Sequence, residues 1–241
     1  MVKDKIKDKI IVALDFSSLE KVKPMVKDLL PYVGCFKIGL QLITAIGAPK
    51  AINSILELGG KVFFDGKFYD IKNTVGEASL AVSSLGVSIF NIHASCGIEA
   101  MAAAVENKGN AKVLAVTVLT SLEENNAFLV FGAPTKAKVI QFARDAKLAG
   151  VDGIICSPQE LEILSKQKEL SSLLKVTPGV RPSWAAANDQ KRIMTPGEAI
   201  LAGATAIVIG RPITKPPKEV KSSIDAAILI HDEINKALGG K

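Results

Sequence analysis

The chain of 241 residues has few of the residues on which several classes of protein depend. Its three cysteines lie far apart and form no C-x-x-C pair, which excludes a disulfide framework and a zinc ribbon. Two histidines are too few for a typical transition-metal site, so no metal is expected. No apolar run approaches the ~20 residues of a membrane span, and the charged N-terminal stretch has no signal-peptide core. We therefore expect a cytoplasmic protein without a membrane partner.

Aromatic residues are also scarce, at 5% of the chain, and this bears on the meaning of its net charge of +6. Nucleic-acid modules usually gather basic residues on one stripe, often beside stacking aromatics. Here the lysines are scattered and alternate with acidic residues, as they do in the first ten positions. We therefore expect no nucleic-acid partner. A mildly basic surface favours a small anionic substrate instead.

Short apolar runs alternate with longer amphipathic stretches along the whole chain, and continuous apolarity is typical of parallel strands covered on both faces. Eight such repeats predict an α/β protein, a (β/α)₈ TIM barrel, with residues 1–241 as a single catalytic domain. An open doubly wound sheet is the alternative, because the pattern does not reveal closure. The predicted strands are 10–15, 35–38, 61–65, 87–92, 112–117, 152–156, 174–177 and 205–209. The predicted helices are 18–31, 41–58, 71–85, 97–107, 135–149, 158–167, 196–202 and 218–238.

Glycines and long connections punctuate this pattern. A glycine follows five of the helical stretches, at the position where a left-handed residue commonly ends a helix. The connections 119–134 and 178–195 follow the fifth and seventh strands, at the end where barrel enzymes build their sites, so we predict functional loops there. The five glycines are Gly34, Gly60, Gly86, Gly150 and Gly203.

The densest polar signal lies at the end of the third predicted strand, where Asp65, Lys67 and Asp70 follow two phenylalanines. Asp65 and Lys67 are two positions apart, so on an extended segment both side chains point to the barrel mouth. Lys37 ends the neighbouring strand and can reach Asp65. Alternating charges would keep these groups ionised despite burial. A structural ion-pair network is the alternative, but burying such charges costs several kcal/mol per ion, which favours a catalytic role.

A second signal is glycine and arginine at the ends of the last two strands. Gly210 and Arg211 follow the eighth strand, and Arg181 follows the seventh in a loop that also contains Gln190. Glycine lets backbone N–H groups approach an anion, and arginine adds a bidentate donor. Since phosphate sites recur at this place in TIM barrels, a phosphorylated substrate is expected. No G-x-G-x-x-G follows the first strand, so a dinucleotide fingerprint is absent.

Together these motifs resemble the orotidine 5′-monophosphate decarboxylase family over residues 11 to about 214. The D-x-K-x-x-D-I core that begins at Asp65 is shared with related sugar-phosphate barrels, and the whole series of motifs is much more specific. The series comprises residues 12–15, 36–39, 65–74, 91–95, 116–121, 177–182, 189–196 and 209–212.

The resemblance implies cofactor-free decarboxylation of orotidine 5′-monophosphate (OMP) to UMP, the last step of de novo pyrimidine synthesis. Lys67 would protonate C6 of the pyrimidine, Asp65 would lie beside the substrate carboxylate, and Lys37 would link Asp65 to the ribose. Asp70 and Thr74 would reach into the partner subunit's site, which implies a homodimer. The other implied substrate contacts are Asp15 at a ribose hydroxyl, Thr120, Ser121 at the pyrimidine edge, and Arg181, Gln190, Gly210 and Arg211 at the phosphate.

Three residues depart from the family's pattern. Gly66 replaces a leucine, which suggests looser packing behind the strand, while Lys72 replaces a proline and Cys96 a glycine. His93 ends the fourth strand and stays outside the predicted site, because a supporting hydrogen-bonded role is equally compatible with its position. Two other functions remain open. One is a magnesium-dependent decarboxylase or aldolase acting on a keto-sugar phosphate, and the other is a non-catalytic nucleotide- or RNA-binding protein.

Overall fold

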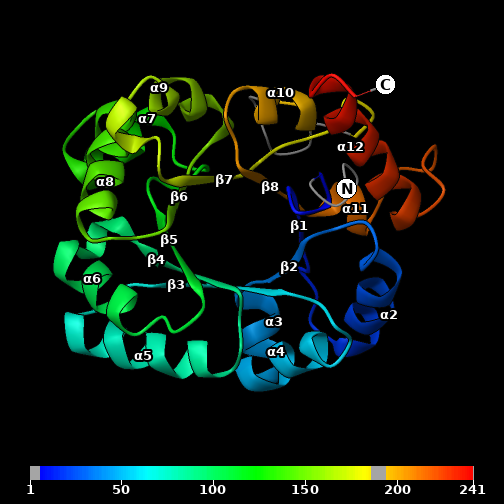
Figure 1. Ribbon diagram of the computed structural model, residues 1–241, viewed down its shortest axis with the longest axis horizontal. Coiled ribbons are helices and arrows are strands. Elements are labelled where there is room, and N and C mark those ends of the chain that lie inside the picture. The colour runs from blue at the N-terminus through cyan, green and yellow to red at the C-terminus, as the bar shows by residue number, and fades with distance from the viewer. Residues whose placement is uncertain (1–5, 186–193, 241) are drawn as a thin grey trace.

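The computed structural model describes residues 6–185 and 194–240, which contain a closed barrel of eight parallel strands in chain order (Figure 1). The last strand pairs with the first, with Ile207 opposite Ile10. This pairing confirms the TIM barrel and rules out the open sheet. The strands are β1 (Ile10–Ala13), β2 (Cys35–Ile38), β3 (Val62–Phe68), β4 (Ile89–His93), β5 (Lys112–Val116), β6 (Gly153–Ile155), β7 (Leu174–Pro178) and β8 (Ala206–Ile209).

Helices surround the barrel on its outside (Figure 1). The α-helices are α2 (Leu19–Leu29), α3 (Leu40–Ile46), α4 (Ala48–Leu56), α5 (Lys72–Ser84), α6 (Ile98–Glu106), α7 (Glu124–Phe131), α8 (Thr135–Leu148), α9 (Leu161–Ser165), α10 (Pro196–Leu201), α11 (Arg211–Thr214) and α12 (Ser223–Ala237). Three short 3₁₀ turns are η1 (Ala94–Cys96), η2 (Pro158–Glu160) and η3 (Lys168–Leu170). No helix in the described part of the chain combines the length and apolarity that crossing a membrane requires.

The strands bury apolar side chains on both of their faces. Successive residues alternate, so Ile11 joins the cluster inside the barrel while Val12 joins the larger cluster between barrel and helices. Phe63 and Leu114 also fill the inside, and Phe90 packs outside. Each large side chain buried in this way stabilises the fold by roughly 1.5–3 kcal/mol. Burial on both faces explains why the strands read as continuous apolar runs.

The helical stretch predicted at 41–58 is two helices, because the backbone breaks at Gly47. Gly47 has a φ of 83°, which a residue with a Cβ rarely adopts, and it separates α3 from α4. Pro49 then lies in the first turn of α4, where a missing N–H costs nothing. A second difference is α7, which occupies half of the connection 119–134 that the sequence predicts as a loop.

The glycine prediction is correct at three positions and wrong at two. Gly86, Gly150 and Gly203 have φ values of 83°, 78° and 107° and end helices as expected. Gly34 and Gly60 have no left-handed backbone. They are required for space instead, because a Cβ would lie 2.6 Å from the Cα of Asp8 at Gly34 and 2.7 Å from Ile55 Cγ2 at Gly60.

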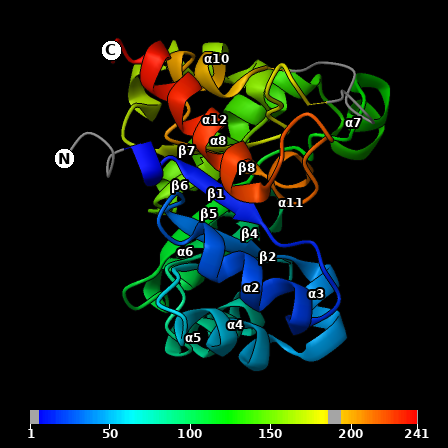
Figure 2. The same ribbon diagram turned by 90° about the vertical axis from the view of Figure 1, so that its right-hand side faces the viewer.

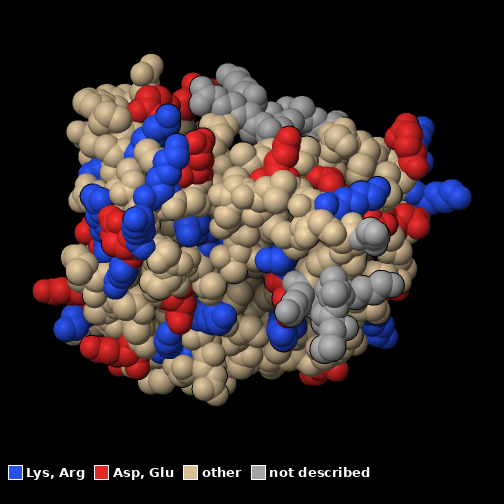
Figure 3. All heavy atoms as spheres, turned by 45° about the horizontal axis from the view of Figure 1, so that its top comes forward, with Lys and Arg blue, Asp and Glu red and all other residues tan. Residues whose placement is uncertain are grey.

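The two ends of the barrel differ in what they carry. Helices α3, α7 and α11, which begin just after β2, β5 and β8, lie at one end, on the right of Figure 2. The carboxyl ends of the parallel strands open at this end, so the polar residues that follow them converge there. On the face shown in Figure 3, Lys and Arg side chains are interspersed with Asp and Glu.

Candidate active site

Four charged side chains meet at the carboxyl ends of β1, β2 and β3. The ammonium of Lys67 lies 2.6 Å from Oδ1 of Asp65, and that of Lys37 lies 2.9 Å from Oδ2 of the same carboxylate. Lys37 is also 3.6 Å from Oδ1 of Asp15, which follows β1. The structure thus brings Asp15, Lys37, Asp65 and Lys67 into one alternating chain of charges.

Asp65 is the central anion of this cluster, and its side chain is only 9% exposed. Burial alone would raise its pKa, but the positive charges of Lys37 and Lys67 outweigh burial and hold the pKa below its ordinary value. Asp65 is therefore ionised at neutral pH. Asp15, by contrast, is 59% exposed at the rim, where solvent screens its charge.

The backbone at Lys67 is not extended as the sequence argument assumed. Lys67 has a φ of 51°, and it is the only residue other than glycine with a left-handed backbone in the described part of the chain. The pairing of β3 with β4 shifts register between Phe64 and Phe68, so the strand bulges at this point. The expectation that Asp65 and Lys67 share a face through strand alternation was therefore wrong. A left-handed turn returns Lys67 to the carboxylate instead.

Asn91, in the middle of β4, completes the cluster and was missed by the sequence prediction. Its side-chain amide donates to Oδ1 of Asp65 at 2.6 Å, and its Oδ1 accepts the backbone N–H of Lys67 at 2.8 Å. The residue is fully buried. An amide inside an otherwise apolar strand is the signal that could have identified it, because a buried amide needs partners.

Two glycines shape the space around these charges. A Cβ at Gly39 would lie 3.1 Å from Nζ of Lys37 and 3.7 Å from Oδ1 of Asp15, so the missing side chain leaves room for the ammonium. A Cβ at Gly66 would lie 2.3 Å from Cε1 of Phe64. The ring of Phe64 fills that space, so the expected loose packing behind the strand is wrong.

Asp70 and Thr74, which follow β3, do not join the cluster within one chain. Both residues are exposed. Oδ1 of Asp70 accepts the backbone N–H of Ile71 at 2.7 Å, just before α5 begins. The sequence prediction placed Asp70 in the charged cluster, and the single chain does not bring it there. The alternative expectation, that it serves a partner's site, concerns a second subunit.

The remaining substrate contacts predicted from the sequence surround the same end of the barrel. Thr120 and Ser121 are exposed between β5 and α7. Gly210 follows β8, and a Cβ there would lie 3.6 Å from Oδ2 of Asp15, so the two strand ends approach each other. Arg211 is exposed at the first position of α11.

Arg181 lies in the connection that follows β7. The residue is 7% exposed, and its backbone N–H donates to the carbonyl of Met194 at 3.1 Å. This bond draws together the two ends of the long connection, in which Gly179 has a φ of 82°. Gln190, the fourth predicted phosphate contact, lies outside the described residues.

His93 ends β4 beside the cluster and contributes no positive charge to it. Burial lowers its pKa, and the nearby charge of Lys67 lowers it further, with Asp65 acting in the opposite direction. Its imidazole lies against the ring of Tyr69, with 5.7 Å between the ring centroids. The imidazole is therefore neutral at pH 7.

The cysteines lie apart from this chemistry. Burial raises the pKa of Cys35 and Cys156 to about 12 and that of Cys96 to about 11. All three are therefore protonated thiols at neutral pH, and a thiol is a poor nucleophile. Within residues 6–185 and 194–240, no group of three or more His, Cys, Asp or Glu is placed to hold a metal ion.

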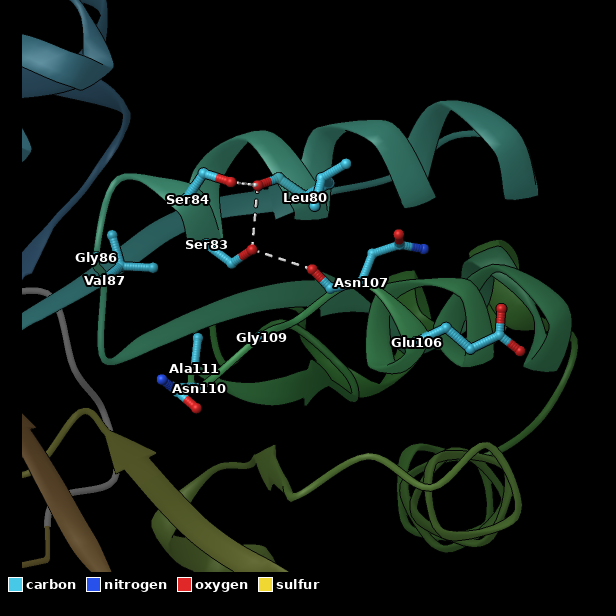
Figure 4. Close-up of a pocket in the computed structure, with 10 residues that line it drawn as sticks. All are labelled: Leu80, Ser83, Ser84, Gly86, Val87, Glu106, Asn107, Gly109, Asn110 and Ala111. Atoms are coloured by element: carbon cyan, nitrogen blue, oxygen red, sulfur yellow. Dashed lines mark hydrogen bonds between the residues drawn. The ribbon is translucent and has the colours of Figure 1, made fainter.

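A cavity of about 540 Å³ lies at the opposite end of the barrel, between the end of α5 and the turn before β5 (Figure 4). The hydroxyl of Ser83 bonds to the carbonyls of Leu80 and Asn107, and that of Ser84 bonds to the carbonyl of Leu80. Glu106 is the one charged residue among those that line the cavity. Among the described residues no lysine or arginine lines this cavity, whereas the charged cluster at the other end contains two lysines.

The closed barrel and the charged cluster at its strand ends define a TIM-barrel enzyme. Residues 8–225 match the model of the orotidine 5′-phosphate decarboxylase / HUMPS family, and the chain belongs to this family. Two relatives named orotidine 5′-phosphate decarboxylase, from Geotalea uraniireducens and Geobacter sulfurreducens, each share 46% sequence identity with this chain over 97% of its length. The matches cover 98% and 99% of those relatives.

One solved structure agrees with this assignment, and a second agrees with the fold. The crystal structure of orotidine 5′-phosphate decarboxylase from Lactobacillus acidophilus superposes with a TM-score of 0.77 at 31% identity, covering 95% of this chain and 99% of that one. The structure of the same name from Pyrococcus horikoshii gives a TM-score of 0.74 at 23% identity, covering 94% of this chain and 99% of that one. At this identity the similarity shows a shared fold.

Proposed function

We propose that this chain is a cytoplasmic orotidine 5′-phosphate decarboxylase that converts OMP to UMP in pyrimidine biosynthesis, with Lys67 as the proton donor. Family membership and relatives of that name over nearly the full length support the reaction. The observation that carries the mechanism is the ammonium of Lys67, held 2.6 Å from a buried, ionised carboxylate at the barrel mouth.

The proposed reaction breaks one carbon–carbon bond and forms one C–H bond. The bond between C6 and the carboxylate carbon breaks, CO₂ leaves, and the electron pair stays on C6. A proton from Nζ of Lys67 then bonds to C6, and the neutral amine regains a proton from solvent. A fixed ammonium stabilises negative charge as it develops on C6 and delivers the proton without a cofactor.

Asp65 has two tasks in this proposal. Its carboxylate holds both Lys37 and Lys67 in place, at 2.9 Å and 2.6 Å. Because it stays ionised, it also repels the carboxylate of a substrate bound beside it. This repulsion disappears as neutral CO₂ forms, so it destabilises the bound substrate more than the transition state.

The rest of the substrate would bind around the cluster. Asp15 would bind a ribose hydroxyl and Lys37 would link Asp65 to the ribose. Thr120 and Ser121 would contact the substrate, with Ser121 at the pyrimidine edge. The phosphate would bind at the ends of the last two strands, where Arg181, Gly210 and Arg211 lie. The resemblance adds Gln190 as a fourth phosphate contact. Binding energy from this remote group can be used to align C6 with the ammonium.

We propose that the active form is a homodimer, because large apolar side chains are exposed after β2 and β3. Leu40, Tyr69 and Ile71 are 58%, 62% and 72% exposed there, and burying such side chains against a second copy is favourable. The same surface presents Asp70 and Thr74, which would enter the partner's site.

A complementation experiment tests the shared site. Lys67→Ala and Asp70→Ala should each be inactive alone. Mixed and re-equilibrated, they should recover up to about a quarter of wild-type activity, because half of the subunits form mixed dimers in which one of two sites is intact. Mixing that restores nothing would show that Asp70 acts within its own subunit.

The reaction itself is tested with purified wild-type protein and OMP, by following the ultraviolet loss of OMP together with UMP and CO₂ as products. The proposal predicts full activity in the presence of a chelator. Activity that requires magnesium and a keto-sugar phosphate would favour the magnesium-dependent decarboxylase or aldolase that the sequence left open. Salt-dependent RNA binding with no consumption of OMP would favour a non-catalytic protein.

A further inference from the structure

Asn91 is a polar residue in a place where an apolar one would pack. It lies opposite Leu114 in the pairing of β4 with β5 and is 0% exposed. Side chains inside the barrel around it include Phe63 and Leu114. A leucine, which has a similar branched shape, would bring no polar atom of its own to this position, so packing alone does not account for an amide.

The two ends of the Asn91 amide bond to two different parts of the charged cluster. Its NH₂ donates to Oδ1 of Asp65, the same oxygen that accepts the ammonium of Lys67. Its oxygen accepts the backbone N–H of Lys67. The amide therefore connects the backbone of the proposed proton donor to the carboxylate that holds its side chain.

The bond to the Lys67 backbone acts at the strained point of β3. The left-handed conformation at Lys67 is disfavoured for a residue with a Cβ. The register shift between β3 and β4 falls at the same point. Asn91 supplies a side-chain acceptor for the Lys67 N–H there, which stabilises the turn that returns the lysine side chain to Asp65.

We infer that Asn91 is a positioning residue for decarboxylation: it fixes the left-handed turn at Lys67 and the orientation of Asp65, so that the ammonium is aimed at C6. Asn91 touches neither the substrate nor the reacting atoms in this role. The inference rests on the proposed function, because it concerns how the proton donor of that reaction is held.

Asn91→Asp is the sharpest test, because it changes one end of the amide only. The new carboxyl group keeps an acceptor for the Lys67 N–H but places a second acceptor against Oδ1 of Asp65. Two carboxylates this close share one proton. A donor to Oδ1 of Asp65 is therefore present only when residue 91 is protonated. The ratio of kcat between variant and wild type should therefore rise as the pH falls from about 8 to 5.5.

Asn91→Leu removes both hydrogen bonds and has no group that titrates. We expect kcat to fall about 100-fold at every pH while KM changes less than about threefold, because the interactions lost act on the transition state. If this variant fails to fold, Asn91→Asp still decides the question through its pH dependence.

Asn107 provides matched controls at the other end of the barrel, in the cavity wall shown in Figure 4. Its amide donates to the carbonyl of Ala103 at 2.9 Å, within α6 and the residue that follows it. Asn107→Asp and Asn107→Leu should keep wild-type kcat at each pH, whatever they do to thermal stability.

The outcomes separate the inference from the proposed function. The inference is overturned if wild type decarboxylates OMP and both Asn91 variants keep kcat within threefold. It is equally overturned if the ratio for Asn91→Asp is the same at pH 8 and pH 5.5. A wild-type protein that leaves OMP intact would instead overturn the proposed function, and the role of Asn91 with it.

Discussion

Asp65→Asn is the substitution that disrupts the charged cluster most, because both Lys37 and Lys67 contact this one carboxylate. The variant keeps the shape of the side chain and removes its charge. Lys37 would keep its ion pair with Asp15, whose Oδ1 lies 3.6 Å away. Lys67 would lose the one carboxylate that it contacts in the described part of the chain. Removing one member of a buried ion pair typically costs about 3–5 kcal/mol. At ~1.36 kcal/mol per factor of ten, a cost borne by the transition state lowers kcat/KM by roughly 10²–10⁴.

The stability of this variant has a pH dependence whose sign follows from the pKa of Asp65. That pKa is lowered in the folded protein, so the carboxylate stabilises the fold above its unfolded pKa of ~3.9. The contribution is lost as the pH falls through the folded pKa. The difference in unfolding free energy between wild type and Asp65→Asn should be constant near neutrality and shrink below about pH 4.

Steady-state kinetics with OMP and denaturant unfolding at several pH values measure both effects. Asp152→Asn is the matched control, because Asp152 lies 2.6 Å from Lys108 just before β6, at the opposite end of the barrel. The control should unfold more easily and keep its kcat/KM. A folded Asp65→Asn variant with kcat/KM within tenfold of wild type would show that Lys67 does not depend on this carboxylate.

Three further predictions concern groups outside the ion pair between Lys67 and Asp65. Burial raises the pKa of Glu160 to about 7, so the folded protein favours its neutral form. The resulting stabilisation of the fold is complete below the unfolded pKa of Glu160 and is lost as the pH rises through 7. Denaturation of wild type and Glu160→Gln should diverge by up to about 3 kcal/mol between pH 4 and 8, and parallel profiles would contradict this. Gly39→Ala places a methyl group against Lys37 and should lower kcat/KM about tenfold; unchanged kinetics would show that the ammonium needs no such space. Arg211→Ala should weaken UMP binding by about 10–100-fold in calorimetry, and an equal loss for uridine would exclude a phosphate contact.

Much of the fold could be predicted from the sequence, because both faces of the parallel strands are buried and the runs between them are amphipathic. The break at Gly47 and the helix at Glu124–Phe131 were not predicted. In the first case a helical pattern continues on both sides of one left-handed residue. In the second, α7 buries only Ala127, so its sequence lacks the apolar stripe on which a helix prediction depends.

The charged cluster shows where sequence reasoning reaches its limit. Charged residues at two neighbouring strand ends indicated that Lys37, Asp65 and Lys67 meet, and topology alone brings those ends together. The bulge at Lys67 and the supporting amide of Asn91 depend on the pairing of β3 with β4, which no local pattern encodes. Asp70 illustrates a different limit, since its predicted role requires a second subunit.

The proposed role of Lys67 is tested most directly by Lys67→Ala, measured for turnover and for binding on the same preparation. We expect no detectable formation of UMP or CO₂ from OMP, together with a UMP dissociation constant within about threefold of wild type, because binding relies mainly on other groups. Decarboxylation at more than about 1% of the wild-type kcat would contradict the assignment of Lys67 as the proton donor.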